Sequence, residues 1–201
     1  MMIKKANATA TKYACEKFHY AQATPAVSYS YNIYNDKNEW CGTICYGHSA
    51  TPTIAKHFGL AQGEILELVR VALNGKQEHT SKAVALSLKK IHQDAPLVKM
   101  IVSYADMAQH HLGTIYQATN WIYTGISYGT AKEYFYKGKW LHPRTLTTIP
   151  NHQKLKKYLP SRMVSNKFRY IFCFDKKLKK QYTKLAQPYP KDKDFTENIR
   201  G

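Results

Sequence analysis

The residues best suited to chemistry gather between Ser103 and Gly125, where a carboxylate, two histidines and several aromatic side chains follow an apolar run. Asp106 can serve as a general base or a metal ligand, and His110 and His111 can ligate a metal or transfer protons. In α/β proteins ligands bind beyond the carboxyl ends of strands, so a loop that leaves a strand is a candidate site. A loop aspartate also often does no more than cap a helix, and the pattern alone leaves both interpretations open.

A helix is expected over residues 113–123, directly after this loop. On such a helix Tyr116, Asn120 and Tyr123 recur at intervals of four and three residues, which places them on one polar and aromatic face. Helices rich in Tyr and Trp most often belong to a core. This face is therefore either part of a binding site or an element of packing.

The charge of the chain indicates a polyanionic partner. Thirty Lys and Arg residues oppose thirteen Asp and Glu residues, for a net charge of +17. The excess is localised, because seventeen of the basic residues but only three acidic ones lie between residues 132 and 193. Such a field attracts nucleic acid first and an anionic membrane surface second. A charge that merely keeps the protein in solution is the alternative.

Other classes of function are disfavoured by the composition. No apolar run reaches the roughly 18 residues of a membrane span, so we expect none, and we expect no secretory signal because no apolar segment lies near the N-terminus. Cys41 and Cys45 lack the second pair of ligands that a zinc site needs. We therefore expect the four cysteines to be reduced and structural.

The elements that must position the chemical residues follow from periodicity and turn signals. Alternating patterns between turn residues predict strands at residues 29–34, 40–47, 64–73, 130–136, 138–141 and 168–174. The apolar run at 97–105 predicts a strand buried on both faces. Helical spacing predicts helices at 7–20 and 80–91. This order predicts the α/β class, with a mixed central sheet flanked by helices.

The order of strands and helices is similar to that of the GNAT-like N-acyltransferase fold, in which a donor binds between two parallel strands. We therefore expect the strands at 66–73 and 98–104 to be adjacent and parallel, and to diverge at their carboxyl ends. We expect a single domain over residues 1–187, followed by a flexible polar tail over residues 188–201.

The run SYADMAQHHLGTIYQATNWIYTG, residues 103–125, resembles the Mom family of phage DNA-modification proteins. Four further segments resemble the family in the same order, at residues 18–21, 66–70, 141–144 and 167–170. The resemblance implies a GNAT-like enzyme that converts adenine in DNA to an N6-carbamoylmethyl derivative and so protects phage DNA from host restriction. It also implies double-stranded DNA as partner, bound iron, and the cytoplasm of an infected or lysogenic bacterial host as location.

The family's functional residues carry over by matching position. The matching residues are His19, Tyr20, Ser103, Tyr104, Asp106, Tyr116 and Asn120. The chain departs from the family at His110, where the resemblance leads us to expect glycine. If that glycine supplies a special backbone angle, the substitution puts the loop conformation in doubt.

To modify adenine, the enzyme must extrude the base from the duplex, stack it on aromatic side chains and remove a proton from its N6 amine. The stacking candidates are Tyr20, Tyr104, Tyr116 and Trp121. Asp106 is the best candidate base, with His19 and His111 next. If iron is present, these same three side chains resemble a two-His-one-carboxylate ligand set. One residue cannot easily be both ligand and base, and the sequence leaves the roles undecided.

The sequence does not identify the donor of the transferred group. GNAT enzymes usually follow the fourth strand with a glycine-containing loop whose amides hold the pyrophosphate of coenzyme A. The residues after Arg70 lack that spacing, so the sequence does not support coenzyme A. The candidates for cofactor binding are Arg70, Gly113, Thr114 and Asn120.

Basic residues of the C-terminal third are the candidates for contact with DNA. They are Arg144, Lys156, Lys157, Arg162, Lys167, Arg169, Lys176 and Lys177. Lysines of this kind bind phosphate without reading sequence, whereas Arg162 and Arg169 can read guanine edges. A solvated helix face is the alternative for residues 176–184.

Three classes of function remain. The first is a transferase that modifies adenine in DNA, the second is a non-catalytic basic protein that binds nucleic acid, and the third is an ordinary GNAT acyltransferase acting on a small amine or on tRNA. A pure binder has no need of a carboxylate in a cationic cleft. The loop from Asp106 to His111, together with Tyr116, therefore favours the first.

Overall fold

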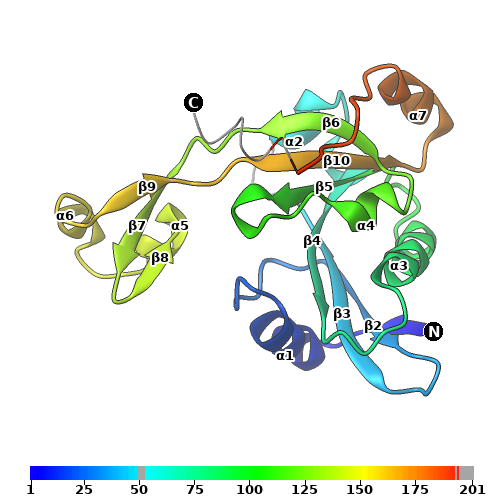
Figure 1. Ribbon diagram of the computed structural model, residues 1–201, viewed down its shortest axis with the longest axis horizontal. Coiled ribbons are helices and arrows are strands. Elements are labelled where there is room, and N and C mark those ends of the chain that lie inside the picture. Colours follow the sequence, from blue (N-terminus) through cyan, green and yellow to red (C-terminus); the bar gives the residue numbers. More distant parts are fainter. Residues whose placement is uncertain (49–52, 193, 195–201) are drawn as a thin grey trace. The chain divides into compact units, whose positions relative to one another are not determined.

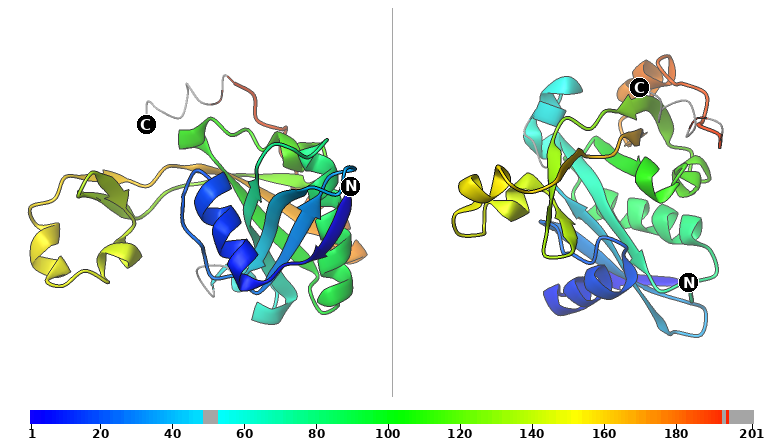
Figure 2. Two further views of the ribbon diagram at one scale, coloured as in Figure 1. Left: turned by 90° about the horizontal axis from the view of Figure 1, so that it is seen from below. Right: turned by 60° about the vertical axis from the view of Figure 1, so that its left-hand side comes forward.

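The computed structural model describes residues 1–48, 53–192 and 194, and the chain divides into two compact units (Figure 1, Figure 2). The first unit contains Met1–Tyr104, Gly113–Thr124 and Arg169–Tyr189. The second contains Ala105–Leu112, Gly125–Phe168 and the described residues after Tyr189. The sequence led us to expect one domain over residues 1–187, because no change in composition marks the points where the chain passes from one unit to the other.

A seven-stranded mixed sheet, in the order β1-β2-β3-β4-β5-β10-β6, belongs mainly to the first unit. Strands β1 to β4 pair antiparallel, whereas β4 and β5 pair parallel. The strands are β1 (Met2–Lys5), β2 (Tyr29–Tyr34), β3 (Trp40–Gly47), β4 (Ile65–Leu73), β5 (Met100–Asp106), β10 (Lys167–Cys173) and β6 (Ile122–Ser127). The helices are α1 (Ala8–Phe18), α2 (Thr53–His57), α3 (Thr80–Asp94), α4 (Thr114–Gln117) and α7 (Lys176–Thr183), with a 3-10 turn η1 (Gln62–Glu64). The predicted α/β class with a mixed central sheet is confirmed.

The parallel strands β4 and β5 pair only at their beginnings. The ladder joins Ile65–Glu67 to Met100–Val102 and stops there, although β4 continues to Leu73 and β5 to Asp106. The predicted divergence of these two strands is therefore confirmed. A bulge in the pairing of β3 with β4 lies in the same part of β4, and a bulge bends its strand locally.

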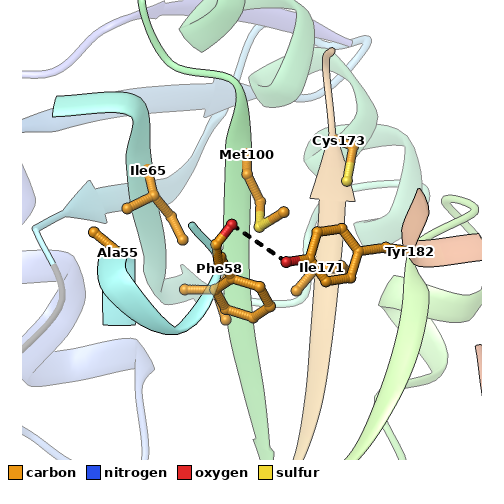
Figure 3. Close-up of a cluster of buried hydrophobic side chains, with 8 residues drawn as sticks. Ala55, Phe58, Ile65, Met100, Ile171, Cys173 and Tyr182 are labelled. Carbon is orange, nitrogen blue, oxygen red and sulfur yellow. Dashed lines mark hydrogen bonds between the residues drawn. The ribbon is translucent and has the colours of Figure 1, made fainter. Parts of the chain in front are cut away.

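One face of the sheet is covered by α2 and α7 through an apolar cluster (Figure 3). The cluster consists of Ala55, Phe58, Ile65, Met100, Val102, Ile171, Cys173 and Tyr182. The Tyr182 hydroxyl donates a hydrogen bond to the backbone oxygen of Phe58 at 3.3 Å, so α7 is linked to the segment after α2. Full burial of a large apolar side chain contributes roughly 1.5–3 kcal/mol. The cluster therefore fixes β5 and β10, the two strands that border the chemical residues.

Helices α1 and α3 cover opposite faces of the sheet. Cys15 of α1 packs against Cys45 of β3, with their sulfur atoms 4.0 Å apart. The next residue of β3, Tyr46, hydrogen bonds through its hydroxyl to the Ser87 hydroxyl of α3 at 2.7 Å. Successive strand residues point to opposite faces, which places the two helices on opposite sides. All four cysteines are buried and free, in agreement with the structural role predicted for them.

The second unit contains a three-stranded antiparallel sheet in the order β8-β7-β9. Its strands are β7 (Lys132–Tyr136), β8 (Lys139–Leu141) and β9 (Ser161–Met163), and its helices are α5 (Pro143–Leu146) and α6 (His152–Lys156) (Figure 1). Asn166 links two loops of this unit, because its backbone oxygen accepts from Met107 N at 3.2 Å and its side-chain oxygen from Gly129 N at 3.0 Å.

Across the described ranges of both units, no helix is long and apolar enough to cross a membrane.

The helix expected over residues 113–123 is a single turn. Helix α4 ends at Gln117, Asn120 adopts the left-handed conformation with φ 59°, and Ile122 begins β6. Asn is one of the few residues that tolerate this conformation, and a helix cannot continue through it. The prediction that Asn120 shares a helical face with Tyr116 is therefore wrong.

The tail expected from residue 188 is anchored at its beginning. The Tyr189 hydroxyl donates to the backbone oxygen of Trp121 at 2.7 Å, and the Tyr189 and Tyr170 ring centroids lie 6.4 Å apart. One aromatic residue in a polar segment supplies this anchor, so the chain is held two residues beyond the predicted end of the domain at residue 187. Residues 193 and 195–201 of the predicted tail lie outside the described residues.

Candidate functional site

A serine and a tyrosine meet where β4 and β5 separate. The Ser103 hydroxyl of β5 lies 3.0 Å from the backbone oxygen of Leu68 on β4 and 2.8 Å from the Tyr116 hydroxyl. A hydroxyl carries one proton and a carbonyl oxygen can only accept, so when Ser103 donates to Leu68 it accepts from Tyr116. The Ser103 side chain thus joins β5 to β4 beyond the end of their backbone hydrogen bonds. It also holds Tyr116 at the point where the two strands diverge.

Tyr116 is surrounded by other rings of the first unit. Its ring centroid lies 5.0 Å from that of Trp121 and 5.1 Å from that of Tyr170. Burial raises the pKa of the Tyr116 hydroxyl to about 12. The hydroxyl therefore keeps its proton at neutral pH, and Tyr116 acts there as a hydrogen-bond donor rather than as a base.

Gly113 permits this packing. Its φ of +77° lies in the left-handed region, and a Cβ atom on it would come within 2.5 Å of the Tyr170 ring. Both the backbone angle and the close approach require glycine. Thr114, the next residue, begins α4. The sequence predicted cofactor binding for Gly113 and Thr114, and the contacts of Gly113 show a packing role.

The segment after α1 brings two further rings to the first unit's site. The His19 and Tyr20 ring centroids lie 4.2 Å apart with the rings tilted by 31°, and His19 Nδ1 accepts a hydrogen bond from Ala21 N at 3.1 Å. Because Nδ1 accepts, a neutral His19 carries its proton on Nε2. Burial is the main cause of the raised pKa of Tyr116. The negative charge of an ionised Tyr20 raises it further, so the two hydroxyls lie near one another. The structure thus groups Tyr20 with Tyr116 and Ser103.

Tyr104 lies on the opposite face of β5 from Ser103, because adjacent strand residues alternate between faces. It packs against the cluster of α2 and α7. Burial raises the pKa of Tyr104 to about 12, with a smaller contribution from the negative charge of Glu67. The sequence grouped Ser103 and Tyr104 in one site, and the strand separates them.

Glu67 is a carboxylate that the sequence analysis did not include among the site residues. It occupies the last paired position of β4, opposite Val102, and its charge acts on the hydroxyls of both Tyr104 and Tyr116. Glu67 therefore stands at the branch point of the two strands. The available signal was an acidic residue in the middle of an apolar strand, since charges are rarely placed there without a role.

Arg169 of β10 is held within the first unit. Its Nε donates to the Thr124 hydroxyl at 2.9 Å, its Nη2 donates to the Thr124 backbone oxygen at 3.3 Å, and its Nη1 lies 3.3 Å from His57 Nε2. The guanidinium also lies 5.6 Å from the Phe58 ring centroid. These contacts tie β10 to β6 and α2. Contact of Arg169 with DNA stays a prediction.

Arg70 lies on the face of the sheet that α1 covers. Its Nη1 donates to the backbone oxygen of Val69 at 2.7 Å. A hydrogen bond to Cys45 lowers the pKa of the Cys15 thiol, and the positive charge of Arg70 lowers it further. Arg70, which the sequence placed among the cofactor-binding residues, thus contacts the core beneath α1.

The loop between β4 and α3 does not form a cradle for pyrophosphate. The Glu78 carboxylate accepts a hydrogen bond from Asp36 N at 2.8 Å, which ties the loop to the turn between β2 and β3. A carboxylate just before the N-terminus of α3 opposes the binding of a second anion there, because like charges repel. The residues of this loop therefore do not fit coenzyme A.

Asp106 caps the 3-10 turn η2 (Met107–Gln109) in the second unit. Its Oδ1 accepts hydrogen bonds from Ala108 N at 3.0 Å and from the Ser165 hydroxyl at 2.6 Å. His110 adopts the left-handed conformation with φ 52°. The position therefore does require the special backbone angle for which glycine is expected, and His110 adopts it.

Among the residues in the described ranges, no group of three or more His, Cys, Asp or Glu side chains is arranged to hold a metal ion. The expected iron ligands lie in different units, His19 in the first and Asp106 and His111 in the second. Within its own unit Asp106 Oδ1 accepts two hydrogen bonds. Iron binding by these three residues stays a prediction.

The basic residues predicted to contact DNA occur in both units. Lys176 and Lys177 begin α7 of the first unit. In the second unit Lys156 ends α6 with its ammonium 5.6 Å from the Tyr134 ring centroid, and Lys157 follows it. The remaining three are placed by their elements: Arg162 in β9, Lys167 at the start of β10, and Arg144 in α5, where its side chain lies outside the described part of the structure.

Arg162 has an aromatic partner that was not predicted from the sequence. The Arg162 guanidinium lies 4.3 Å from the Trp140 ring centroid, and Arg162 also pairs with Glu133 at 3.0 Å. Phe135 lies beside Trp140 on the neighbouring strand. The signal was present as the aromatic run Tyr134–Tyr136 between lysines, but it was interpreted only as a strand.

Comparison with known proteins agrees with this architecture. A spermidine/spermine N-acetyltransferase of Vibrio cholerae superposes with a TM-score of 0.51 over 89% of this chain and 95% of that chain, at 5% identity. A chimeric spermidine N-acetyltransferase, derived in part from the same organism, superposes with a TM-score of 0.50 over 86% of this chain and 96% of that chain, at 6% identity. These likenesses show the fold, and the predicted GNAT-like fold is confirmed.

The sequence comparison is more specific. A protein of Escherichia phage Mu, named methylcarbamoylase mom, is 29% identical in an alignment 188 residues long that covers 86% of this chain and 76% of that protein. The family model described as the Mom protein family matches residues 1–191. That match takes in Ser103, Tyr116 and Glu67 as well as the whole of the small sheet, and the chain belongs to the Mom protein family.

Proposed function

We propose that this protein is a transferase that converts adenine in double-stranded DNA to an N6-carbamoylmethyl derivative, and that it protects phage DNA from restriction in the cytoplasm of the bacterial host. Membership of the Mom family and the name of the phage Mu relative support a phage DNA modification. The observation that carries the proposal is the contact between the Ser103 and Tyr116 hydroxyls where β4 and β5 diverge, with Glu67 at the last position of β4 that pairs with β5.

The acceptor base sets the chemical task. The N6 amine of adenine is a weak nucleophile, because its lone pair is delocalised into the ring, and in duplex DNA it is also paired. The enzyme must extrude the base, support its ring and accept a proton from the amine as the new bond forms. Tyr20 is 49% exposed and contacts the His19 ring at a tilt, so it offers an exposed aromatic ring to an extruded base.

Glu67 is the proton acceptor in this proposal. Tyr116 stays protonated at neutral pH because burial raises its pKa to about 12, and neutral His19 carries its proton on Nε2. Glu67 is the carboxylate at the last position of β4 that pairs with β5, and it leaves the strand on the face of Val102 and Tyr104. Carboxylates are commonly ionised at neutral pH, so Glu67 can accept a proton. The hydrogen bonds of Ser103 to the Leu68 oxygen and to Tyr116 position the backbone of β4 beside Glu67.

Asp106 has a positioning role in this proposal. Its two accepted hydrogen bonds fix the loop between β5 and α4, which leads to Gly113 and Tyr116. The role explains why this position suits Asp, since a short carboxylate accepts from the backbone two residues ahead. Asp106 as a base or as a metal ligand is the competing hypothesis from the sequence.

The test is mass spectrometry of nucleosides from cells that express the protein, compared with cells that express a Glu67→Gln variant. We expect a deoxyadenosine derivative with the mass of an added carbamoylmethyl group in the first sample alone. Unmodified adenine in cells that contain folded, DNA-binding protein would support the non-catalytic binder instead. Modification of a small amine or of tRNA would support the ordinary acyltransferase.

A further inference from the structure

One face of the small sheet in the second unit carries an unusual set of side chains. The register pairs Phe135 with Trp140 and Glu133 with Arg162. Residues 133 and 135 of β7 share a face because strand residues alternate, and directly paired residues lie on the same face. The face therefore presents two aromatic rings, one guanidinium and one carboxylate, which we call the aromatic face.

The side chains of the aromatic face are held in a fixed arrangement. The ring centroids of Phe135 and Trp140 lie 5.3 Å apart. The Arg162 guanidinium lies 4.3 Å from the Trp140 centroid, while Arg162 Nε and Nη2 each lie 3.0 Å from a Glu133 carboxylate oxygen. The ion pair with Glu133 thus orients a flat cation over a flat ring before any partner binds.

The aromatic face is accessible to solvent. Phe135 is 38% exposed and Trp140 is 36% exposed. The opposite face of β7 carries Tyr134, over which Lys156 of α6 places its ammonium group. Helix α6 therefore contacts the sheet on the side of Tyr134, and the two large rings of the aromatic face stay exposed. Exposed rings of this size gathered in one place are typical of a binding surface.

The charge of the surroundings selects the partner. Residues 125–168 contain nine Lys and Arg residues and one acidic residue, Glu133, which is already paired with Arg162. A surface of this charge attracts a polyanion and repels a second copy of itself. Flat rings and a flat guanidinium within a cationic field are the combination by which proteins bind nucleic acid bases that are not stacked in a duplex.

We propose that the aromatic face is a stacking platform for unpaired bases of DNA. This proposal rests on the proposed function. Extrusion of an adenine from a duplex leaves bases without their normal stacking neighbours, and these bases would stack on the aromatic face. Trp140 and Phe135 contact the base faces, Arg162 supports Trp140, and the surrounding lysines contact phosphates. Stacking tolerates any base, so the platform adds affinity for opened DNA without adding sequence preference.

The experiment compares the binding of three DNA probes by the full chain, using fluorescence anisotropy at one fixed salt concentration. The probes are a single-stranded oligonucleotide, a fully paired duplex, and the same duplex with one mismatched adenine. We expect Trp140→Ala to weaken binding of the single strand and of the mismatched duplex by about tenfold, the loss of one stacking contact. Binding of the paired duplex should change little.

Two further variants separate stacking from folding. Trp140→Phe keeps an aromatic ring and should restore most of the lost affinity, whereas a small sheet that merely fails to fold would weaken binding of all three probes.

Tyr158→Ala is the matched control, because Tyr158 is an aromatic residue of the same unit that is 85% exposed and lies outside the small sheet. It should leave all three affinities unchanged. The salt dependence should also be unchanged in Trp140→Ala, since no charge is removed.

The proposal is overturned if Trp140→Ala weakens the paired duplex as much as the single strand, or if it leaves both unaffected. A change in oligomeric state without a change in DNA affinity would show that the face binds another copy of the chain, and would also overturn it. Its failure is separate from that of the proposed function. Modified adenine with no effect of Trp140→Ala rejects only the platform, and unmodified adenine with the expected effect rejects only the chemistry.

Discussion

The two units use aromatic residues in opposite environments. In the first unit Tyr116 is enclosed by Trp121 and Tyr170, and its hydroxyl is fixed by Ser103. In the second unit Trp140 lies under a guanidinium and beside exposed cations. Burial keeps the first hydroxyl protonated and immobile, as a site for chemistry requires. Exposure leaves the second ring able to contact a large partner. The environment and not the residue type separates these two uses.

The largest expected effect concerns the carboxylates of the two units. Glu67→Gln keeps the size of the side chain but removes its basicity, so we expect adenine modification to fall by about 10²–10⁴-fold while DNA affinity is retained. Asp106→Asn is the matched change in the second unit. Its amide oxygen can still accept from Ala108 N and Ser165, so activity should be largely kept. Rates of nucleoside modification in vitro measure both.

The opposite outcome would reverse the assignment of roles. If folded Asp106→Asn is inactive while Glu67→Gln is active, the proton acceptor belongs to the second unit. The second unit would then contain the catalytic carboxylate, and it could not be described as a unit that only contacts DNA.

The packing of the first unit should be intolerant of one added methyl group. Gly113→Ala places a Cβ against Tyr170 and forces a left-handed angle on alanine, so we expect a loss of about 2–4 kcal/mol in the free energy of unfolding. Urea denaturation measures it. Gly63→Ala is the control, because a Cβ at Gly63 meets open space. Equal stabilities for the two variants would show that the ring cluster is loosely packed.

The raised tyrosine pKa values predict a loss of stability in alkali. The folded state holds the Tyr116 proton up to a pKa of about 12, whereas an unfolded tyrosine releases it near pH 10. This contribution is complete below pH 10 and is lost as the pH rises to 12, by roughly 2–3 kcal/mol. Tyr116→Phe should flatten the decline measured by urea denaturation between these pH values. An unchanged decline would mean that the hydroxyl is not desolvated.

The second unit should determine how DNA binding responds to salt. Replacement of both Lys156 and Lys157 with Ala should reduce the slope of log affinity against log salt by up to about 2, because each phosphate contact contributes about 0.9. The control is Lys89→Ala, which removes an exposed cation of α3 in the first unit. If Lys89→Ala reduces the slope and the double variant does not, DNA lies against the first unit instead.

The smallest expected effect is at His110. His110→Gly relieves a left-handed angle that costs about 1–2 kcal/mol for an ordinary residue, but glycine loses about 0.5–1 kcal/mol through its greater freedom in the unfolded chain. We expect a net gain of about 0.5 kcal/mol in thermal or urea denaturation. His111→Gly, at a position without this angle, should instead be destabilising.

The sheet was predictable because its signals are local. The apolar runs that became β4 and β5 end at turn residues, and the resemblance to a known family supplied their parallel order. The single turn of α4 was not predictable from the same rules. Its aromatic spacing fits a helix, and only the left-handed Asn120 and the pairing of β6 in the sheet exclude one.

The site was less predictable than the sheet, because it depends on which face of a strand each residue occupies. Ser103 and Tyr104 are neighbours in sequence but lie on opposite faces of β5, and Tyr116 reaches Ser103 through a loop. Glu67 joins the site because the ladder between β4 and β5 ends at it; the sequence shows an acidic residue in an apolar strand, but not where the ladder ends. Alternation along a strand is visible in a sequence, but the distance at which two strands part is not.

The tight contact between Cys15 and Cys45 has a consequence at the other end of α1. The helix is held to the sheet by these two sulfur atoms and by Ala14 and Ala72, all fully buried. Only His19 separates the end of α1 at Phe18 from Tyr20, so any tilt of α1 moves that ring. A bulkier residue at position 15 would therefore tilt α1 away from the sheet. The tilt would change the position of the Tyr20 ring, and with it the space available to an extruded base.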